Sequence, residues 1–219
     1  MTSLFLEPFS GISGDMLNGL LVDLGGDVAL LRSELEKLGV DGFHLHVDHI
    51  AKSAIWGTDF DVHLHHGEKD TGIEGDFDHK HHHDHEHGHS HVDARSYADI
   101  HDLIAASQLS PFVKEKSLAV FLDIAKAEAA VHNMPVEQIH FHEIGAIDSI
   151  VDIVSFFILV ESLGIDTVYS TPLTEGSGTI SVAHGEMPVP VPAVIQLRKG
   201  ITIPITQDFT VKTELITPT

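Results

Sequence analysis

The stretch from Ile139 to Asp152 carries the densest set of side chains that can do chemistry: His140, His142, Glu143, Asp148 and Asp152. In extended backbone alternate side chains share a face, so His140 and His142 would be neighbours. After Gly145 the apolar residues recur at helical spacing, which places Asp148 and Asp152 on one helix face. The pattern therefore predicts a strand that delivers two imidazoles to the start of a carboxylate-bearing helix.

Imidazoles and carboxylates are ligands that divalent first-row metals accept, and two His with one or two carboxylates leave coordination positions open. We therefore predict a metal or proton-transfer site in this stretch. A structural alternative stays open at the level of sequence. Asp148 near a helix N-terminus is favoured by the unpaired amides and the macrodipole, and the histidines can be strand residues with satisfied hydrogen bonds.

A second concentration of metal-binding side chains lies in the polar segment from Gly67 to Asp93. This segment has too few apolar residues to offset its ordering entropy, so we expect a disordered, mobile insertion. Imidazoles interleaved with acids chelate Ni, Cu, Co or Zn in many interchangeable geometries, which suits metal capture. An inert polar spacer is the alternative. The predicted ligands here are His79, His81, His82, His83, His85, His87, His89 and His91.

A glycine-containing turn follows the first apolar run, Leu4 to Phe9, and leads into a helix expected from about Asp15 to Leu24. A strand, a glycine turn and a helix start form an anion site, because glycine lets amides approach and the helix N-terminus presents free N–H groups. An ordinary strand-to-helix turn is the alternative. The carboxylate of Asp15 would point toward a bound cation. The predicted binding residues are Ser10, Gly11, Ser13 and Gly14.

The composition limits the classes of function. The net charge of −21, from 33 acidic and 12 basic residues among 219, repels nucleic acids and anionic membranes. The absence of cysteine excludes disulfides, thiolate nucleophiles and Cys-ligated metal sites, so metal ligands must be N or O donors. The N-terminus does not resemble a signal peptide and no apolar run is long enough to span a bilayer, so we expect a cytoplasmic protein.

Helical and strand patterns alternate along the chain, which predicts a mixed α/β (α+β) fold with helices packed on a mixed sheet. We expect one domain over residues 1–219, interrupted by the insertion at 67–93. Besides the first helix, helices are predicted at Asp27–Leu38, Ser96–Ala106, Ser110 to about His132 and about Ala146 to Leu163, with a short one ending at Arg198. Ser13 is expected to cap the first helix, Ser96 and Asp99 have the spacing of a capping box, and Ser110-Pro111 is a typical helix start. The last two strands are predicted at Ile201–Ile205 and Thr210–Ile216.

The segment from Phe43 to Leu64 alternates apolar and polar residues, which predicts an antiparallel pair of strands separated by Ala51 to Thr58. Phe60, Val62 and Leu64 are expected on the buried face, and the histidines on the polar face are expected to be solvated rather than bound to a ligand.

Several segments together resemble one family. They are Phe9 to Met16 (FSGISGDM), His140 to Asp152, the His-rich insertion, Ala183 to Pro190 (AHGEMPVP) and Glu214 to Thr219 (ELITPT). The combination resembles the nickel insertion proteins of nickel-pincer cofactor biosynthesis, which are nickel chelatases, of the lyase class, acting on pyridinium-3,5-bisthiocarboxylic acid mononucleotide. The likeness extends over essentially the whole chain.

The resemblance implies insertion of nickel into this mononucleotide, in the pathway that makes the lactate racemase cofactor. It also implies dependence on CTP with Mg²⁺ or Mn²⁺, which the family attributes to a C-terminal half. The chain would thus be an N-terminal half that works with that partner, and lactate racemase would receive the cofactor. We also expect an oligomer.

On this hypothesis the insertion collects nickel, and His140, His142 and Glu143 hold it until the substrate sulfurs displace them. Asp15, Asp148 and His184 would complete the site or handle protons, and the substrate phosphate would bind at the glycine turn. The alternative is a nickel-binding metallochaperone or storage module without catalysis of its own. A metal-dependent hydrolase is a third class.

Overall fold

The computed structural model describes residues 1–64, 95–141, 147–182 and 185–218. The predicted insertion at 67–93 therefore lies outside the described residues. So do three of the predicted site residues, His142, Glu143 and His184.

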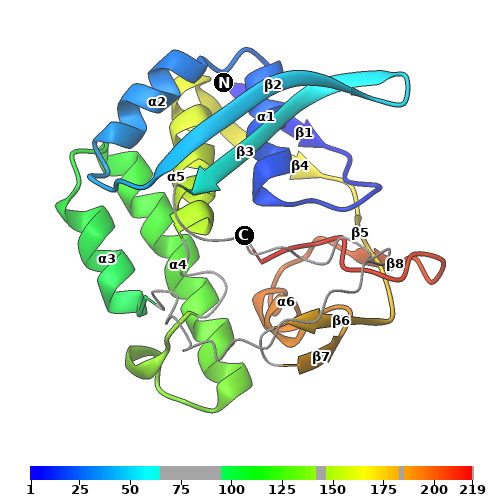
Figure 1. The fold of residues 1–219 in the computed structure, drawn as a ribbon. Helices are drawn as coiled ribbons and strands as arrows, with labels where there is room; N and C mark the ends of the chain where they lie inside the picture. The colour runs from blue at the N-terminus through cyan, green and yellow to red at the C-terminus, as the bar shows by residue number, and fades with distance from the viewer. Residues whose placement is uncertain (65–94, 142–146, 183–184, 219) are drawn as a thin grey trace, which may run out of the picture.

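The apolar periodicities of the sequence become helices (Figure 1). The described helices are α1 (Gly14–Asp23), α2 (Val28–Glu36), α3 (Tyr97–Ala106), α4 (Pro111–His132), α5 (Ile147–Ser162) and α6 (Pro192–Leu197), with a 3-10 turn η1 (Val136–Gln138). Every predicted bound of an α-helix lies within two residues of the observed one, whereas η1 was not predicted. None of them combines the length and apolarity needed to cross a bilayer.

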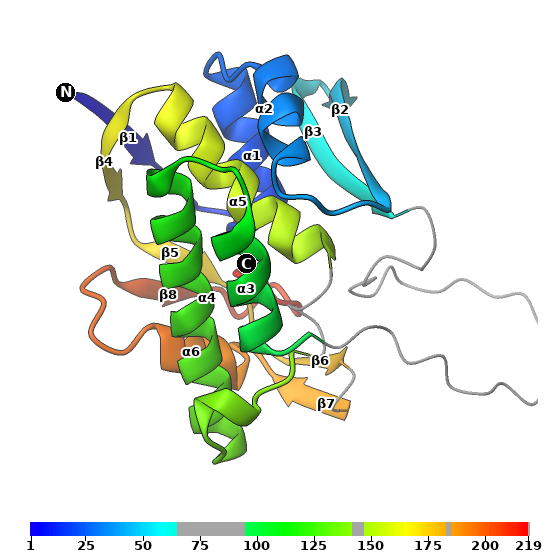
Figure 2. The same cartoon turned by 90° about the vertical axis from the view of Figure 1, so that its left-hand side faces the viewer.

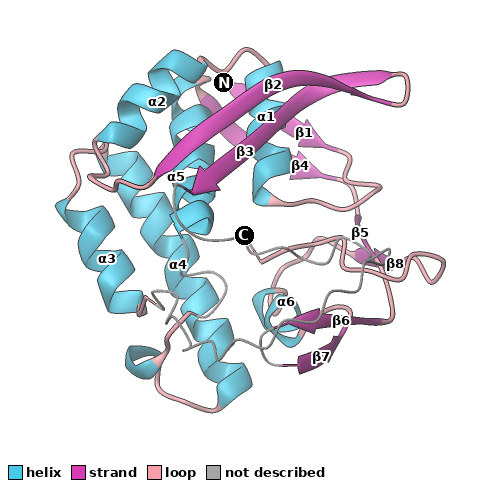
Figure 3. Cartoon of the chain, viewed as in Figure 1, coloured by secondary structure: helices cyan, strands magenta, loops and turns pink. Residues whose placement is uncertain are grey.

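The described strands associate in pairs (Figure 3). They are β1 (Thr2–Leu6), β2 (Phe43–Lys52), β3 (Ile55–Leu64), β4 (Ile165–Ser170), β5 (Leu173–Glu175), β6 (Thr179–Val182), β7 (Gly185–Pro188) and β8 (Ile205–Gln207). The β1–β4 and β5–β8 pairs are parallel, whereas β2–β3 and β6–β7 are antiparallel hairpins. The mixed α/β class predicted from the sequence is confirmed.

The central element of the core is α5, whose buried residues include Ile150, Val151, Val154 and Leu159. It contacts α1, α2, α4, β3 and β4. In Figure 2, α3 and α4 lie side by side below the α1–α2 layer. The helix α5 runs between this layer and α4, and it contacts both. A helix that is apolar on most of its faces is stable only when neighbours cover it, and α5 has such neighbours.

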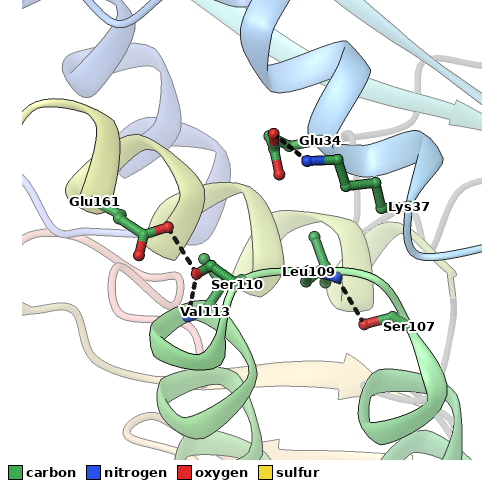
Figure 4. A network of polar contacts seen from close by, with 7 residues as sticks. All are labelled: Glu34, Lys37, Ser107, Leu109, Ser110, Val113 and Glu161. Carbon is green, nitrogen blue, oxygen red and sulfur yellow. Dashed lines mark hydrogen bonds and ion pairs between the residues drawn. The ribbon is translucent and has the colours of Figure 1, made fainter.

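The helix starts show the capping that the sequence predicts. At α3 the Ser96 hydroxyl accepts from the Asp99 amide at 3.2 Å, and the Asp99 carboxylate accepts from the Ser96 amide at 2.8 Å, which is a capping box. At α4 the Ser110 hydroxyl accepts from the Val113 amide at 3.2 Å and donates to Glu161 of α5 at 2.7 Å (Figure 4). One side chain thus caps α4 and joins it to α5.

The prediction for the last two strands was wrong. The range predicted as a strand from Ile201 contributes only Ile205 to β8, and Thr210–Ile216 is not a strand. β8 pairs with β5, not with the segment that follows it. Short segments of β-favouring residues take their partner from the tertiary structure, because a strand is stable only where another edge satisfies its amides and carbonyls.

Candidate functional site

The glycine turn after β1 is held by the last described segment of the chain. Gly11 has a φ of +95°, and a Cβ at this position would lie 2.1 Å from the Leu215 carbonyl oxygen. The Ile12 amide donates to that oxygen at 2.7 Å, and the Thr217 amide donates to the Ile12 carbonyl at 3.2 Å. Only glycine allows both the left-handed backbone and this close approach.

At the start of α1, the carboxylate of Asp15 accepts hydrogen bonds from its own turn of the chain. Ser13 occupies the N-cap position, as predicted, but its hydroxyl makes no capping bond. It donates instead to the Asp15 carboxylate, and the Met16 amide donates to the same Oδ1 at 2.8 Å. The carboxylate thus provides the negative charge that a helix N-terminus favours. Asp15 is exposed to solvent.

Two contacts show that α1 and α5 run in the same direction. The buried Asn18 of α1 donates from Nδ2 to the carbonyl oxygen of Asp152 at 3.1 Å and contacts its Oδ1 at 3.4 Å. Eight residues further on, Gly26 packs against Leu159, seven residues after Asp152. Residue numbers therefore increase in the same direction along both helices, so the first turns of α1 and α5 lie at the same end of the pair.

This shared end carries two carboxylates that were predicted as site residues, one on each helix. Asp15 lies one turn before Asn18 in α1, and Asp148 lies one turn before Asp152 in α5. Asp148 is half-buried, and its Oδ1 accepts from the Ser149 amide at 2.8 Å. The helix-start contact that the structural alternative expected for Asp148 is therefore present, and Asp152 is held by Asn18.

His140 lies on an extended segment, as its alternating neighbours predict. Ile139 and Phe141 are each 3% exposed, whereas His140 is exposed. The segment pairs with the residues that precede α3: His140 forms a bridge with Ser96, and the Phe141 amide donates to the Arg95 carbonyl at 3.0 Å. Arg95 is the first described residue after 65–94, so the chain leaving the His-rich segment runs directly beside His140.

A further acidic group stands close to His140. Hydrogen bonds from the Ser96 hydroxyl and amide lower the pKa of Asp99, with smaller contributions from the positive charges of His140 and Arg95. Asp99 therefore stays ionised beside the imidazole. The sequence predicted only a capping role for this residue, and its place beside His140 depends on the Ser96–His140 bridge. In another part of the molecule, hydrogen bonds from Thr210 lower the pKa of Asp208 in the same way.

A pocket of about 290 Å³ lies between the end of β1, the glycine turn and α1. Ser10 and Gly11 of the predicted phosphate site line it, and Ser13 and Gly14 follow at the start of α1. Its walls also carry large exposed apolar side chains, which are Phe5, Phe9, Met16 and Leu20. A larger cavity of about 600 Å³ between α4 and α6 is not lined by any predicted site residue.

One buried acid that positions the glycine turn was not predicted from the sequence. Glu175 is fully buried, and its Oε1 accepts from the Gly176 and Leu215 amides, each at 2.8 Å. Leu215 in turn accepts from Ile12, so the carboxylate supports the turn through one backbone segment. The only signal in the sequence is a glutamate preceding Gly-Ser-Gly, a pattern that is typical of a turn.

The described residues do not contain a ready-made metal centre. Within residues 1–64, 95–141, 147–182 and 185–218, no three His, Asp or Glu side chains are grouped so that they could hold a metal ion. The structure brings Asp15 and Asp148 to one end of the α1–α5 pair and places His140 beside the exit of the His-rich segment. The roles predicted for His142, Glu143, His184 and the eight histidines of the insertion fall outside the described residues.

Comparison with known proteins shows the family. Residues 4–219 match the sequence model described as "Nickel insertion protein". Two relatives carry the name pyridinium-3,5-bisthiocarboxylic acid mononucleotide nickel insertion protein. One, from Lactiplantibacillus plantarum, is 55% identical over 219 residues, which is all of this chain and 51% of the relative. The other, from Acetivibrio thermocellus, is 44% identical over 225 residues, which is all of this chain and 50% of the relative.

A third relative with this name, from Desulfitobacterium hafniense, is 43% identical over the whole chain and 48% of its own length. The chain therefore spans about half the length of these relatives. No solved structure matches. The match over nearly the whole sequence shows that this chain belongs to the nickel insertion protein family.

Proposed function

We propose that this chain takes part in inserting nickel into pyridinium-3,5-bisthiocarboxylic acid mononucleotide. The observation that carries the proposal is the family match over residues 4–219, together with relatives named for this reaction at up to 55% identity over the whole chain. We treat residues 1–219 as one nickel-insertion domain in which the His-rich segment is an insertion.

The donor chemistry supports this reaction. The chain has no cysteine, so it offers nickel no thiolate, and the proposed ligands are imidazoles and carboxylates. The two thiocarboxylate groups named in the substrate provide the soft sulfur ligands. A protein that holds nickel only through exchangeable N and O donors can release the metal to a sulfur ligand, which is what an insertion reaction requires.

In the proposed reaction, His140, His142 and Glu143 hold the nickel ion before transfer. The Phe141–Arg95 hydrogen bond supports this assignment, because it places Arg95, two residues after the His-rich segment in the sequence, beside the strand of His140. Asp15 and Asp148 start two helices that run in the same direction, so both carboxylates can act at that end of the molecule. They and His184 are proposed to complete the ligand set or to accept protons released by the substrate.

The pocket beside the glycine turn is the proposed substrate site. The amides of Ser13 and Gly14 are proposed to contact the phosphate, since the first amides of a helix have no acceptor within the helix. Ser10 and Gly11, whose amide donates to the Pro8 carbonyl at 3.4 Å, are proposed to line the site. The exposed ring of Phe9 and the other apolar walls suit a flat heteroaromatic ring. The lining of the pocket thus offers both kinds of surface that the mononucleotide presents.

The remaining features of the reaction are also proposals. We assign CTP, with Mg²⁺ or Mn²⁺, to the further half that the relatives have, and we propose that this half and the present chain form one lyase-class nickel chelatase. Lactate racemase is the proposed recipient of the finished cofactor. We further propose that the protein acts in the cytoplasm as an oligomer.

The test replaces both proposed imidazole ligands, His140→Ala with His142→Ala, in this chain combined with the rest of a full-length insertase. Mass spectrometry of the nucleotide product measures nickel incorporation. Loss of two of three ligands should lower incorporation by about 100-fold or more, because the open site then lacks its nitrogen donors. His101→Ala, at an exposed histidine of α3, is the matched control and should retain activity. Full incorporation by the double variant would refute the site.

A storage function is the second candidate, and the His-rich segment favours it. Eight histidines within residues 79–91 can bind several nickel ions without any reaction. In that case the His140/His142 double variant would bind as much nickel as the parent protein, and no variant of the described residues would change product formation. Incorporation that falls while bulk nickel binding persists would support insertion over storage.

A further inference from the structure

The β2–β3 hairpin has one polar face, and its composition is unusual. Alternation along both strands places Phe60 and Val62 in the core and turns the intervening residues outward. The antiparallel register sets these outward residues opposite one another, as His44 with His63, His46 with Asp61, and Asp48 with Asp59. Three imidazoles and three carboxylates therefore share a single exposed surface.

The imidazoles of this face lie close together. The ring centroids of His44 and His63 are 5.1 Å apart, and those of His46 and His63 are 5.3 Å apart. His63 is thus the shared neighbour of the other two. The side chains of His46 and His63 are 48% and 43% exposed, so both rings are accessible to an ion from solution.

These separations fit shared coordination of one ion. A ligating nitrogen lies about 2 Å from a divalent metal and the ring centre about 1 Å further, so two imidazoles at roughly tetrahedral or octahedral angles have centroids about 4.5–5.3 Å apart. Both His pairs are within or at the edge of that range.

Carboxylates already orient two of the rings. His63 Nε2 contacts Asp61 Oδ2 at 2.7 Å, and His46 Nε2 contacts Asp48 Oδ2 at 2.8 Å. A metal-ligating histidine usually donates its second ring N–H to a carboxylate, which fixes the tautomer and raises the basicity of the ligating nitrogen. With Nε2 engaged in this way, Nδ1 is the nitrogen that meets the metal.

We propose that His44, His46 and His63 form an exposed docking site for a divalent first-row metal ion such as Ni²⁺. His63 binds the ion together with one of its two neighbours, and water fills the other positions. Two protein ligands at a time agree with the finding that no three side chains of the described residues form a ready metal group. The site does not depend on the proposed insertion reaction, because it requires only metal binding.

The expected use of such a site is transfer rather than retention. Two imidazoles with water bind nickel more weakly than a closed set of three or four ligands, so the ion exchanges readily. The site also lies next to Leu64, the last described residue before the His-rich segment. An acidic protein with a net charge of −21 attracts cations to this surface.

The test is modification of each histidine by diethyl pyrocarbonate, followed by peptide mass spectrometry, on the full chain with and without Ni²⁺. Nickel should slow the modification of His63 by about fivefold or more and that of His44 and His46 by about twofold, because a coordinated nitrogen is not nucleophilic and each neighbour is coordinated only part of the time. Mg²⁺, which prefers oxygen ligands, should not protect them. His101 is the internal control: its Nδ1 contacts Asp102 at 3.1 Å, but its ring neighbour is Tyr97 rather than a second imidazole.

The variant His63→Ala removes the shared ligand and should abolish nickel protection at His44 and His46, whereas His101→Ala should leave it intact. Far-UV circular dichroism checks that both variants fold, and His63→Gln replaces His63→Ala if the alanine variant does not. Two results would overturn the proposal. In one, nickel slows the modification of the three histidines no more than that of His101 in the parent chain. In the other, nickel still protects His44 and His46 in the His63→Ala variant.

Discussion

At the scale of single residues, the candidate site depends on a backbone feature as much as on side chains. Gly11 combines a φ of +95° with direct contact to Leu215. The buried Glu175 holds the other side of Leu215 through its amide. The position of Ser10 and Ile12 beside the pocket therefore follows from the backbone conformation of Gly11 and from Glu175, a carboxylate with no predicted contact with substrate.

Replacing Gly11 tests this. Gly11→Ala should lower the free energy of unfolding by about 2–4 kcal/mol, because alanine is strained at positive φ and its Cβ would displace the Leu215 carbonyl. Urea unfolding followed by circular dichroism measures the change. Gly25→Ala is the matched control, since Gly25 has a φ of +106° but a Cβ added there would meet no atom within 4 Å. Equal losses in the two variants would show that contact with Leu215 adds nothing.

The acidic residues show why residue type alone leaves the site open. Asp15 and Asp148 were predicted as site residues for their chemistry, and each also has a local contact at its own helix start. A carboxylate at such a position is favoured whether or not it binds a ligand. Whether such a carboxylate only stabilises its helix or also binds a ligand depends on which other side chains lie near it. For Asp15 and Asp148, this depends on how α1 packs against α5.

At the scale of elements, the helix boundaries follow local chemistry closely. The Ser96 capping box and the Ser110-Pro111 start were predicted from sequence and are confirmed. These signals act within four residues, so they do not depend on the rest of the fold. The partner of Ser110 across the helices, Glu161, was not predictable, because it is 51 residues away.

The start of α4 therefore offers a second stability test. Ser110→Ala should lower the free energy of unfolding by about 1 kcal/mol through loss of the capping bond, with a few tenths more from the exposed contact to Glu161. Thermal unfolding provides the measurement. Ser110→Thr keeps a hydroxyl at the cap and should retain most of the stability. A threonine variant as unstable as the alanine variant would show that the cap contributes little.

The strands show the opposite balance. The β2–β3 hairpin is predicted well because alternation over ten residues in each strand specifies which face is buried. Its turn is tighter than expected, since the strands extend to Lys52 and Ile55 instead of stopping around Ala51–Thr58. Three-residue strands such as β5 and β8 have too little pattern to identify their partners.

At the scale of the whole molecule, two groups of histidines lie near the described residues that border the His-rich segment. The chain beside His140 leads directly out of the His-rich segment, and the polar face of the β2–β3 hairpin leads into it. Leu64 and Arg95, the described residues on either side of 65–94, thus lie near His63 and His140 respectively. This arrangement supports a path from metal capture to transfer.

Removing residues 67–93 tests the division between capture and insertion. The shortened chain should bind fewer nickel ions in equilibrium dialysis, because eight histidines are lost. Combined with the rest of the insertase, it should still form nickel-loaded nucleotide at high nickel but need about tenfold more metal for the same rate. A variant with those histidines replaced by asparagine at unchanged length separates ligand loss from shortening. Product formation that stops at every nickel concentration would show that the segment itself belongs to the insertion site.

Residue types and their short-range spacing were enough to predict the mixed α/β class, most helix boundaries and the inward faces of the first hairpin. These features follow from periodicity and capping, which act over a few residues. Three others became known only from the folded chain: α1 and α5 run in the same direction, Glu175 holds Leu215 against Gly11, and Arg95 lies beside Phe141. Each of these joins residues far apart in the chain, so packing of the whole core, and no local pattern, determines which partners meet.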